Sequence, residues 1–208
     1  MTELIKILIV DDHKVVRDSL EREFCPGKGF EVVGSLASAG DAEELCGVKR
    51  PDVIIMDVCT EHGASGLEAS EKILKSYPDI KIIVTSGFDE VTYMPRAKDI
   101  GAHAFVYKIK GLEYYSEVVK RVLDGEYVFP DPLTIPMPHG ETSFTDREME
   151  VLRLMCKYLD SQKVAEELFI EKKTVERHIE NMRKKAGFSR YTELMAYVLS
   201  NGWINPNY

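Results

Sequence analysis

Residues 5–12 (IKILIVDD) and 53–57 (VIIMD) decide the fold of this chain. Each stretch is a short apolar run that ends in one or two aspartates. Continuous runs rich in Ile and Val are typical of strands that are covered on both faces, as in parallel sheets. Both stretches therefore predict buried strands with acidic residues at their carboxyl ends.

The sequence around these two stretches alternates between apolar runs and amphipathic segments. Further strands are expected at Glu31–Ser35, Lys81–Ser86 and Ala104–Tyr107. Helical periods lie between the strands, at Lys14–Phe24, Asp41–Val48, Leu67–Tyr77, Glu90–Asp99 and Tyr114–Leu123. Strands that alternate with helices indicate a parallel sheet with right-handed crossovers. We therefore predict a five-stranded, doubly wound α/β domain over residues 1–126.

A segment with four prolines, Tyr127–Thr142, follows this domain. Proline fixes φ and removes a backbone donor, so residues 127–142 are predicted to form a stiff linker. Residues 143–208 then show helical periods alone and predict an all-α domain of four helices. The first of these begins at the capping box Thr145–Glu148; the others are expected at Ser161–Leu168, Lys172–Ala186 and Thr192–Ser200.

The charge is distributed unevenly along the 208 residues. The whole chain carries a net charge of -8, but residues 143–208 carry 11 basic and 10 acidic residues. A nucleic-acid contact is therefore expected only in this last third, on a local basic face. The four cysteines have no metal-binding spacing. No apolar stretch predicts a membrane span or a signal peptide, so we expect a cytoplasmic protein without a membrane contact.

The aspartates of the first and third predicted strands are expected to converge. In a doubly wound sheet, the carboxyl ends of these strands are neighbours. Asp11, Asp12 and Asp57 would repel one another unless a cation neutralises them, and oxygen ligands favour Mg²⁺. Ser86 and Lys108 end the fourth and fifth strands. Carboxylates, a hydroxyl and an ammonium around Mg²⁺ indicate a site for phosphoryl transfer.

These residues carry a resemblance to a known family. The motifs LIVDDH (8–13), IIMD (54–57), Ser86, Gly101-Ala102 and Lys108 resemble the receiver domain of bacterial response regulators, over about residues 4–125. The resemblance implies that Asp57 accepts phosphate from a histidine kinase. It implies that Asp12, Asp57 and the Cys59 carbonyl bind Mg²⁺, with Asp11 acting through water. It assigns Ser86, Phe105 and Lys108 to the switch, with Thr85 as the competing hydroxyl.

The segment after Asp57 departs from the receiver pattern. Val58–Gly66 (VCTEHGASG) is one residue longer than usual and lacks Met-Pro, and its Glu61 adds an acid. This departure leaves open a receiver that is phosphorylated weakly. His13 follows the acidic pair and is interpreted as a first-turn helix residue.

The block 143–204 resembles the LuxR-type helix-turn-helix of NarL/FixJ-type regulators. The resemblance rests on Thr145–Glu148, Val164-Ala165, Leu168, Ile170, Thr174-Val175, His178, Lys185 and Gly187. It implies that the segment 172–186 enters the major groove of DNA. The expected contacts are Lys172, Lys173, Thr174, Arg177, Asn181, Arg183 and Lys184. Glu176 and Glu180 depart from the usual basic or small polar residues.

The two resemblances together predict a regulator of transcription that is not an enzyme beyond phosphoryl transfer at Asp57. Phosphorylation is expected to favour a homodimer that binds promoter DNA. Two alternatives stay open. The glutamates of the DNA-facing segment favour a receiver module that acts through protein partners, and the loop after Asp57 favours a constitutive regulator.

Overall fold

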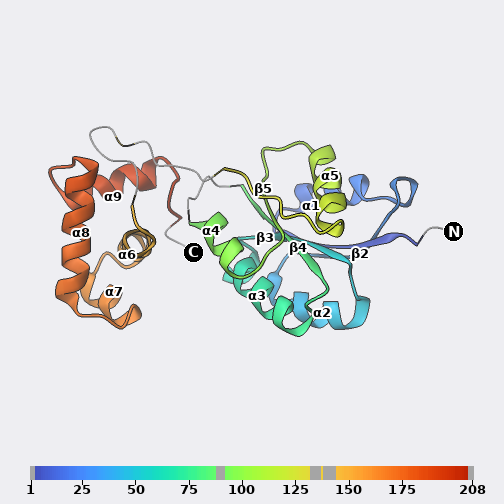
Figure 1. Ribbon diagram of the computed structural model, residues 1–208, viewed down its shortest axis with the longest axis horizontal. Coiled ribbons are helices and arrows are strands. Elements are labelled where there is room, and N and C mark those ends of the chain that lie inside the picture. The colour runs from blue at the N-terminus through green and yellow to red at the C-terminus, as the bar shows by residue number, and fades with distance from the viewer. Residues whose placement is uncertain (1–2, 88–91, 132–136, 138–143, 206–208) are drawn as a thin grey trace. The chain divides into compact units, whose positions relative to one another are not determined.

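The computed structural model describes residues 3–87, 92–131, 137 and 144–205 (Figure 1). The chain divides into two compact units. The first comprises residues 1–87 and 93–131, and the second includes residues 132–208. Each unit has its own hydrophobic core.

A five-stranded parallel sheet forms the centre of the first unit. Its strands are β1 (Ile5–Val10), β2 (Phe30–Leu36), β3 (Val53–Asp57), β4 (Lys81–Ser86) and β5 (Ala104–Tyr107). The hydrogen-bonded order is β2-β1-β3-β4-β5, and each neighbouring pair is parallel. This is the predicted doubly wound, flavodoxin-like sheet, whose strand order reverses at β1 and places the ends of β1 and β3 side by side.

Helices cover both faces of this sheet (Figure 1). They are α1 (Lys14–Glu23), α2 (Ala42–Lys49), α3 (Gly66–Ser76), α4 (Tyr93–Asp99) and α5 (Leu112–Leu123). Helices α1 and α5 lie on one face, and α2, α3 and α4 lie on the other. The predicted start of α4 at residues 90–91 lies outside the described residues. Three short 3₁₀ turns, at Pro26–Lys28, Ala39–Asp41 and Glu61–Gly63, were not predicted, because three residues carry no periodic signal.

The first unit extends past the predicted domain end. Val128 is 5% exposed and pairs with Ala104 of β5 in a parallel bridge. Its carbonyl accepts the N–H of Phe105 (2.9 Å), and its N–H donates to the His103 carbonyl (3.0 Å). Residues 127–131 therefore belong to the first unit, although the prolines at 130 and 132 led us to place the linker from Tyr127. Most of the remaining predicted linker, 132–136 and 138–142, lies outside the described residues.

The second unit contains four helices in its described part, residues 144–205. They are α6 (Asp146–Tyr158), α7 (Ser161–Glu167), α8 (Lys172–Ala186) and α9 (Tyr191–Ser200). Thr145 and Glu148 form the predicted capping box at the start of α6. Val151, Val164, Val175 and Val198 are completely buried and hold the four helices together. Gly187 ends α8 with φ of 75°, the left-handed conformation that glycine adopts without strain.

Candidate functional site

The predicted acidic residues come together at the carboxyl edge of the sheet. Asp11 follows β1 and Asp57 ends β3, and both carboxylates are almost completely buried. Lys108, just after β5, bridges them: its Nζ lies 2.7 Å from Oδ2 of Asp11 and 2.8 Å from Oδ2 of Asp57. One ammonium from the fifth strand thus holds carboxylates from the first and third strands.

Two further groups complete this acidic cluster. Ligand atoms of Asp11, Asp12, His13 and Asp57 all lie within 4.8 Å of one another. The backbone N–H of His13 donates to Oδ1 of Asp11 (2.9 Å). The Nδ1 of His13 lies 2.5 Å from Oδ1 of Asp12. His13 is the N-cap residue just before α1 and not, as predicted, a residue of its first turn, and its ring lies beside the acids.

Burial and charge shift the acid–base behaviour of the cluster. Burial raises the pKa of Asp57 to about 7; Lys108 opposes this shift, and the charges of Asp11 and Asp12 add to it. Burial acts to lower the pKa of Lys108, but Asp57 and Asp11 outweigh it and the pKa is raised. Lys108 therefore stays charged at neutral pH. Its one positive charge does not balance the negative charge of the carboxylates. The cluster is suited to a bound cation.

The loop after β3 is fixed closely against Asp57. The N–H of Gly66 donates to the Val58 carbonyl (2.9 Å), and the backbones of Cys59 and Ser65 form an isolated antiparallel β-bridge. A Cβ atom at residue 66 would lie 1.8 Å from the Asp57 carbonyl oxygen, so glycine is required there. The Thr60 hydroxyl joins the loop to the rest of the unit, since it accepts the N–H of Ala39 and donates to the Ala64 carbonyl. The acidic cluster of the described residues does not include Glu61.

In the second unit, the predicted DNA contacts differ in whether their charges are already paired. Arg183 is engaged: its Nε and Nη2 donate to Glu180 (2.7 and 2.6 Å), and its Nη1 donates to the carbonyls of Phe188 and Ser189. Lys184 lies 3.3 Å from Glu180, and Lys172 lies 3.9 Å from Glu176. Lys173 and Arg177 form no ion pair in the part of the chain that the structure describes. Arg183 therefore joins α8 to the following turn, which its basic side chain alone did not indicate.

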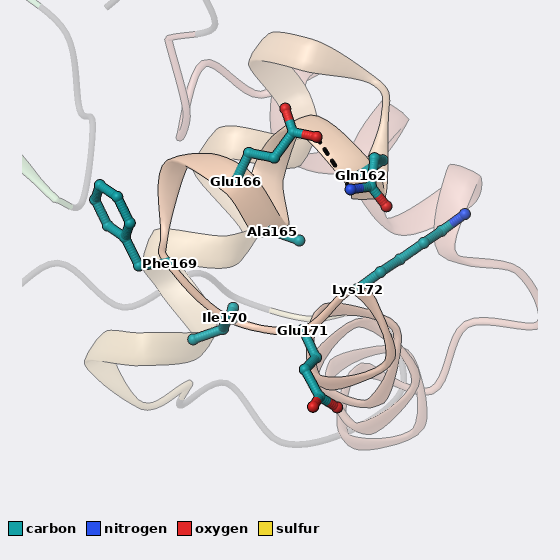
Figure 2. Close-up of a pocket in the computed structure, with 7 residues that line it drawn as sticks. All are labelled: Gln162, Ala165, Glu166, Phe169, Ile170, Glu171 and Lys172. Atoms are coloured by element: carbon teal, nitrogen blue, oxygen red, sulfur yellow. Dashed lines mark hydrogen bonds between the residues drawn. The ribbon is translucent and has the colours of Figure 1, made fainter.

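The turn between α7 and α8 is tight and partly strained (Figure 2). Phe169 has φ of 52°, and its ring points away from the helices into solvent, with 96% of the residue exposed. The N–H of Ile170 donates to the Ala165 carbonyl (3.0 Å) and closes the turn. A shallow pocket beside the turn is lined by Gln162, Ala165, Glu166, Phe169, Ile170, Glu171 and Lys172. The short connection orients α8 against α7, as a helix-turn-helix requires.

Each of the two units matches a known protein family. Residues 7–119 match the response regulator receiver domain, and residues 142–198 match the bacterial regulatory proteins of the luxR family. The chain belongs to the LuxR-type response regulators. VraR response regulators from Staphylococcus epidermidis and Staphylococcus aureus are each 30% identical over 207 residues, which cover 96% of this chain and 99% of theirs.

Solved structures agree with this assignment. A LuxR-family DNA-binding response regulator from Staphylococcus aureus is 27% identical with a TM-score of 0.54, and the match covers 57% of this chain and 98% of that one. RcsB from Salmonella typhimurium has a TM-score of 0.61 at 18% identity, over 96% of this chain and 100% of that one. The likeness to RcsB concerns the fold. Among the described helices of this response regulator, none has the length and apolar composition of a membrane span.

The strand register of this response regulator bears on the switch hydroxyl. Asp57 lies opposite Thr85 in the β3–β4 register, and paired residues of neighbouring parallel strands point to the same face of a sheet. Ile55 and Ile83, two residues earlier, both belong to the core beneath α1 and α5. Ser86, the next residue of β4, pairs with Tyr107 of β5. Thr85 and Ser86 are both buried at the end of β4, so Ser86 stays the predicted switch hydroxyl and Thr85 the competing one.

Phe105 already occupies the interior of the receiver. The residue is 1% exposed, and its ring contacts Tyr107 edge-on with centroids 5.2 Å apart. The part of Phe105 in the switch stays a prediction.

Two residues near the acidic cluster were missed from the sequence. The Nη1 of Arg17 donates to the carbonyls of Asp11 and Asp12 (2.6 and 3.1 Å) and fixes the turn that carries them. Tyr115 is buried on α5, and burial together with the charges of Asp11 and Asp57 raises its pKa. Nothing in the local sequence marked either side chain for its role.

Proposed function

We propose that this chain is a phosphorylation-controlled transcription regulator of a two-component system. Asp57 accepts a phosphoryl group from a sensor histidine kinase: a carboxylate oxygen bonds to phosphorus, and the bond from phosphorus to the kinase imidazole breaks. The observation that supports this most directly is Lys108, whose Nζ lies within 2.8 Å of both Asp11 and Asp57. An ammonium in that place can stabilise the charge of the phosphoryl oxygens.

The acidic cluster fits Mg²⁺, which would be held by Asp11, Asp12, Asp57 and the backbone carbonyl of Cys59. The carboxylate oxygens of Asp11, Asp12 and Asp57, which lie within 4.8 Å of one another, support this fit. When bound, Mg²⁺ would neutralise the carboxylates and the transferred phosphoryl group. The chain acts as a regulator and not as an enzyme, apart from phosphoryl transfer and hydrolysis at its own Asp57.

Phosphorylation is proposed to bias a two-state surface through the switch residues. Ser86 is assigned the role of the switch hydroxyl, and Thr85, which pairs with Asp57 in the strand register, is the competing residue. Ser86→Ala should lower phosphate-dependent dimerisation about tenfold, whereas Thr85→Ala should lower it much less. Sedimentation of each variant with and without acetyl phosphate measures this difference. The reverse order of the two effects would assign the role to Thr85.

The second unit is proposed to bind promoter DNA as part of a homodimer in the cytoplasm. Lys172, Lys173, Thr174 and Lys184 would contact phosphates, and Arg177 and Asn181 would contact base edges. Two recognition helices engage two half-sites only when the chain is dimeric. Phosphorylation would therefore raise DNA affinity by raising the fraction of dimer.

The test is Asp57→Asn in the full chain, with Asp99→Asn on the exposed end of α4 as a control of equal charge. Intact mass after incubation with acetyl phosphate and Mg²⁺ should show a phosphate adduct on the parent chain and on the control, and none on Asp57→Asn. DNA binding should rise with the phosphodonor only where the adduct forms. An adduct on Asp57→Asn, or binding that ignores the phosphodonor, contradicts the proposal.

The ion pairs of Glu180 favour one alternative, a receiver that acts through protein partners without DNA. Glu180 already pairs with Arg183 and Lys184, two of the predicted DNA contacts. Gel shifts with random-sequence duplexes across a salt series separate the two functions, because electrostatic DNA binding strengthens steeply as salt falls. An absence of binding at the lowest salt would favour the alternative.

A further inference from the structure

Four side chains stand on successive turns of the exposed face of α8. Lys173, Arg177, Glu180 and Lys184 follow the spacing of 4, 3 and 4 residues that places side chains on one face of a helix. Val175, Met182 and Ala186 form the opposite, buried face. A single acid therefore stands among three cations, on the face that a helix-turn-helix presents to DNA.

The carboxylate of Glu180 is held in one orientation. Both of its oxygens accept hydrogen bonds from Arg183, at 2.6 and 2.7 Å. Arg183 is itself anchored, because its Nη1 also donates to the carbonyls of Phe188 (2.7 Å) and Ser189 (3.2 Å). Lys184 adds a third cationic contact at 3.3 Å. This clamp fixes the carboxylate, whereas a solvated glutamate would sample many rotamers.

Glu176, the other acid of α8, lacks this support. Among the described residues its one ion pair is with Lys172 at 3.9 Å, and both side chains are at least half exposed. It lies one turn before Glu180 and outside the row formed by residues 173, 177, 180 and 184. Of the two acids that depart from the family pattern, Glu180 alone combines a place in the row with a fixed orientation.

A fixed carboxylate in the major groove discriminates between bases. It accepts a hydrogen bond from the N4 amino group of cytosine, and it repels phosphates and the acceptor edge of guanine. The two bonds from Arg183 leave lone pairs on both oxygens for a further donor. A role in helix stability alone would explain the ion pairs, but it predicts no preference for any base.

We propose that Glu180 determines specificity by selecting a cytosine in each half-site, with Arg183 as the residue that positions it. The inference rests on the proposed DNA-binding function. It predicts that the operator contains a base pair whose cytosine cannot be replaced without loss of affinity.

The experiment selects binding sites from a random duplex library with the full chain, in acetyl phosphate and Mg²⁺. The parent chain is compared with Glu180→Gln and with Glu167→Gln, which makes the same charge change on the exposed surface of α7. The parent and Glu167→Gln should both favour cytosine at one position by roughly tenfold. Glu180→Gln should lose this preference and favour adenine there, because glutamine pairs with the adenine edge. Thermal melting of each variant establishes that it is folded.

The outcomes separate the two claims. If the parent chain recovers no DNA at low salt, the proposed DNA-binding function and the role of Glu180 both fail. If the parent chain selects a sequence and Glu180→Gln selects the same one, the role of Glu180 fails and the DNA-binding function stands. If Glu176→Gln, tested in parallel, shifts the preference and Glu180→Gln does not, the assignment to Glu180 is likewise overturned.

Discussion

The acidic pocket and helix α8 neutralise charge in opposite ways. In the pocket, one largely buried ammonium, Lys108, holds carboxylates that come from two other strands. On α8, Glu180 pairs with cations three and four residues away, on the surface of the same helix. The pocket charges were brought together by the fold, whereas the α8 charges were neighbours before the chain folded.

This difference determines what each set of charges can do. Buried ion pairs between distant segments are costly to break, because a lone charge then remains in a poorly solvated place. Ion pairs on an exposed helix contribute little to stability. A substitution in the pocket should therefore also destabilise the receiver fold. A substitution on the exposed face of α8 can instead change DNA recognition at little cost in stability. Four predictions sharpen this comparison, from the largest expected effect to the smallest.

The largest effect is expected from Lys108→Met. This change leaves the carboxylates of Asp11 and Asp57 without their common ammonium, so the receiver should lose about 2–3 kcal/mol of stability at pH 8 without Mg²⁺. Urea unfolding followed by far-ultraviolet circular dichroism measures the loss. Lys110→Met, an exposed lysine two residues later, is the control and should cost far less. Equal losses would show that the pocket is no different from the surface.

A buried group that is kept neutral should make the receiver sensitive to acid. His103 accepts the N–H of Ile82 through Nδ1 (3.3 Å), and burial, assisted by Lys81, lowers the pKa of its ring to about 4. The unfolded chain takes up this proton first, so stability should fall between pH 6.5 and 4, by at most about 3 kcal/mol.

His103→Asn keeps an acceptor near the Ile82 N–H and removes the titration, so its stability should change less over this range. Urea midpoints at pH 7 and pH 4.5 make the comparison. The exposed His62 provides the control, since His62→Asn should keep the acid dependence of the parent chain. A parallel loss in His103→Asn and in the parent would exclude His103 as the cause.

A smaller effect is expected at the capping box of α6. Burial acts to raise the pKa of Glu148, but bonds from Lys185 and Thr145 outweigh it and hold the pKa below its usual value. Glu148→Ala should cost the second unit about 1–2 kcal/mol. The single tryptophan, Trp203, packs against the core of this unit, so its fluorescence reports unfolding there. Glu150→Ala, which breaks an exposed pair with Arg147, should shift the midpoint less.

The smallest effect is expected for the pair of Lys172 and Glu176. The side chains are half exposed and 3.9 Å apart, so Glu176→Gln should leave the melting temperature of the full chain unchanged within error. Differential scanning calorimetry measures this. A clear drop in the melting temperature would contradict the view that surface charges on α8 contribute little to stability.

The sequence predicted the features that depend on local pattern and chain order. Apolar runs marked the strands, and alternation with helices marked a parallel sheet, so the meeting of Asp11 and Asp57 followed from topology. The capping box at Thr145 and the helix 172–186 followed from local motifs. These features need no knowledge of how distant side chains pack.

The missed features depend on side-chain geometry. The guanidinium of Arg17 reaches two carbonyls, and that of Arg183 reaches Glu180 and two further carbonyls. Neither arginine differs in sequence from a solvated surface residue. Such roles arise from three-dimensional contacts that periodicity does not encode.

The pairing of Val128 with β5 decides where the receiver can be cut. Strand β5 is an edge strand of the sheet, and Val128 pairs with part of its free edge. A fragment that stops at Glu126 would leave the N–H of Phe105 and the carbonyl of His103 unpaired. An edge strand with unpaired backbone groups promotes self-association. A fragment that continues to Asp131 keeps these groups paired and is the one to prepare for crystallisation or spectroscopy.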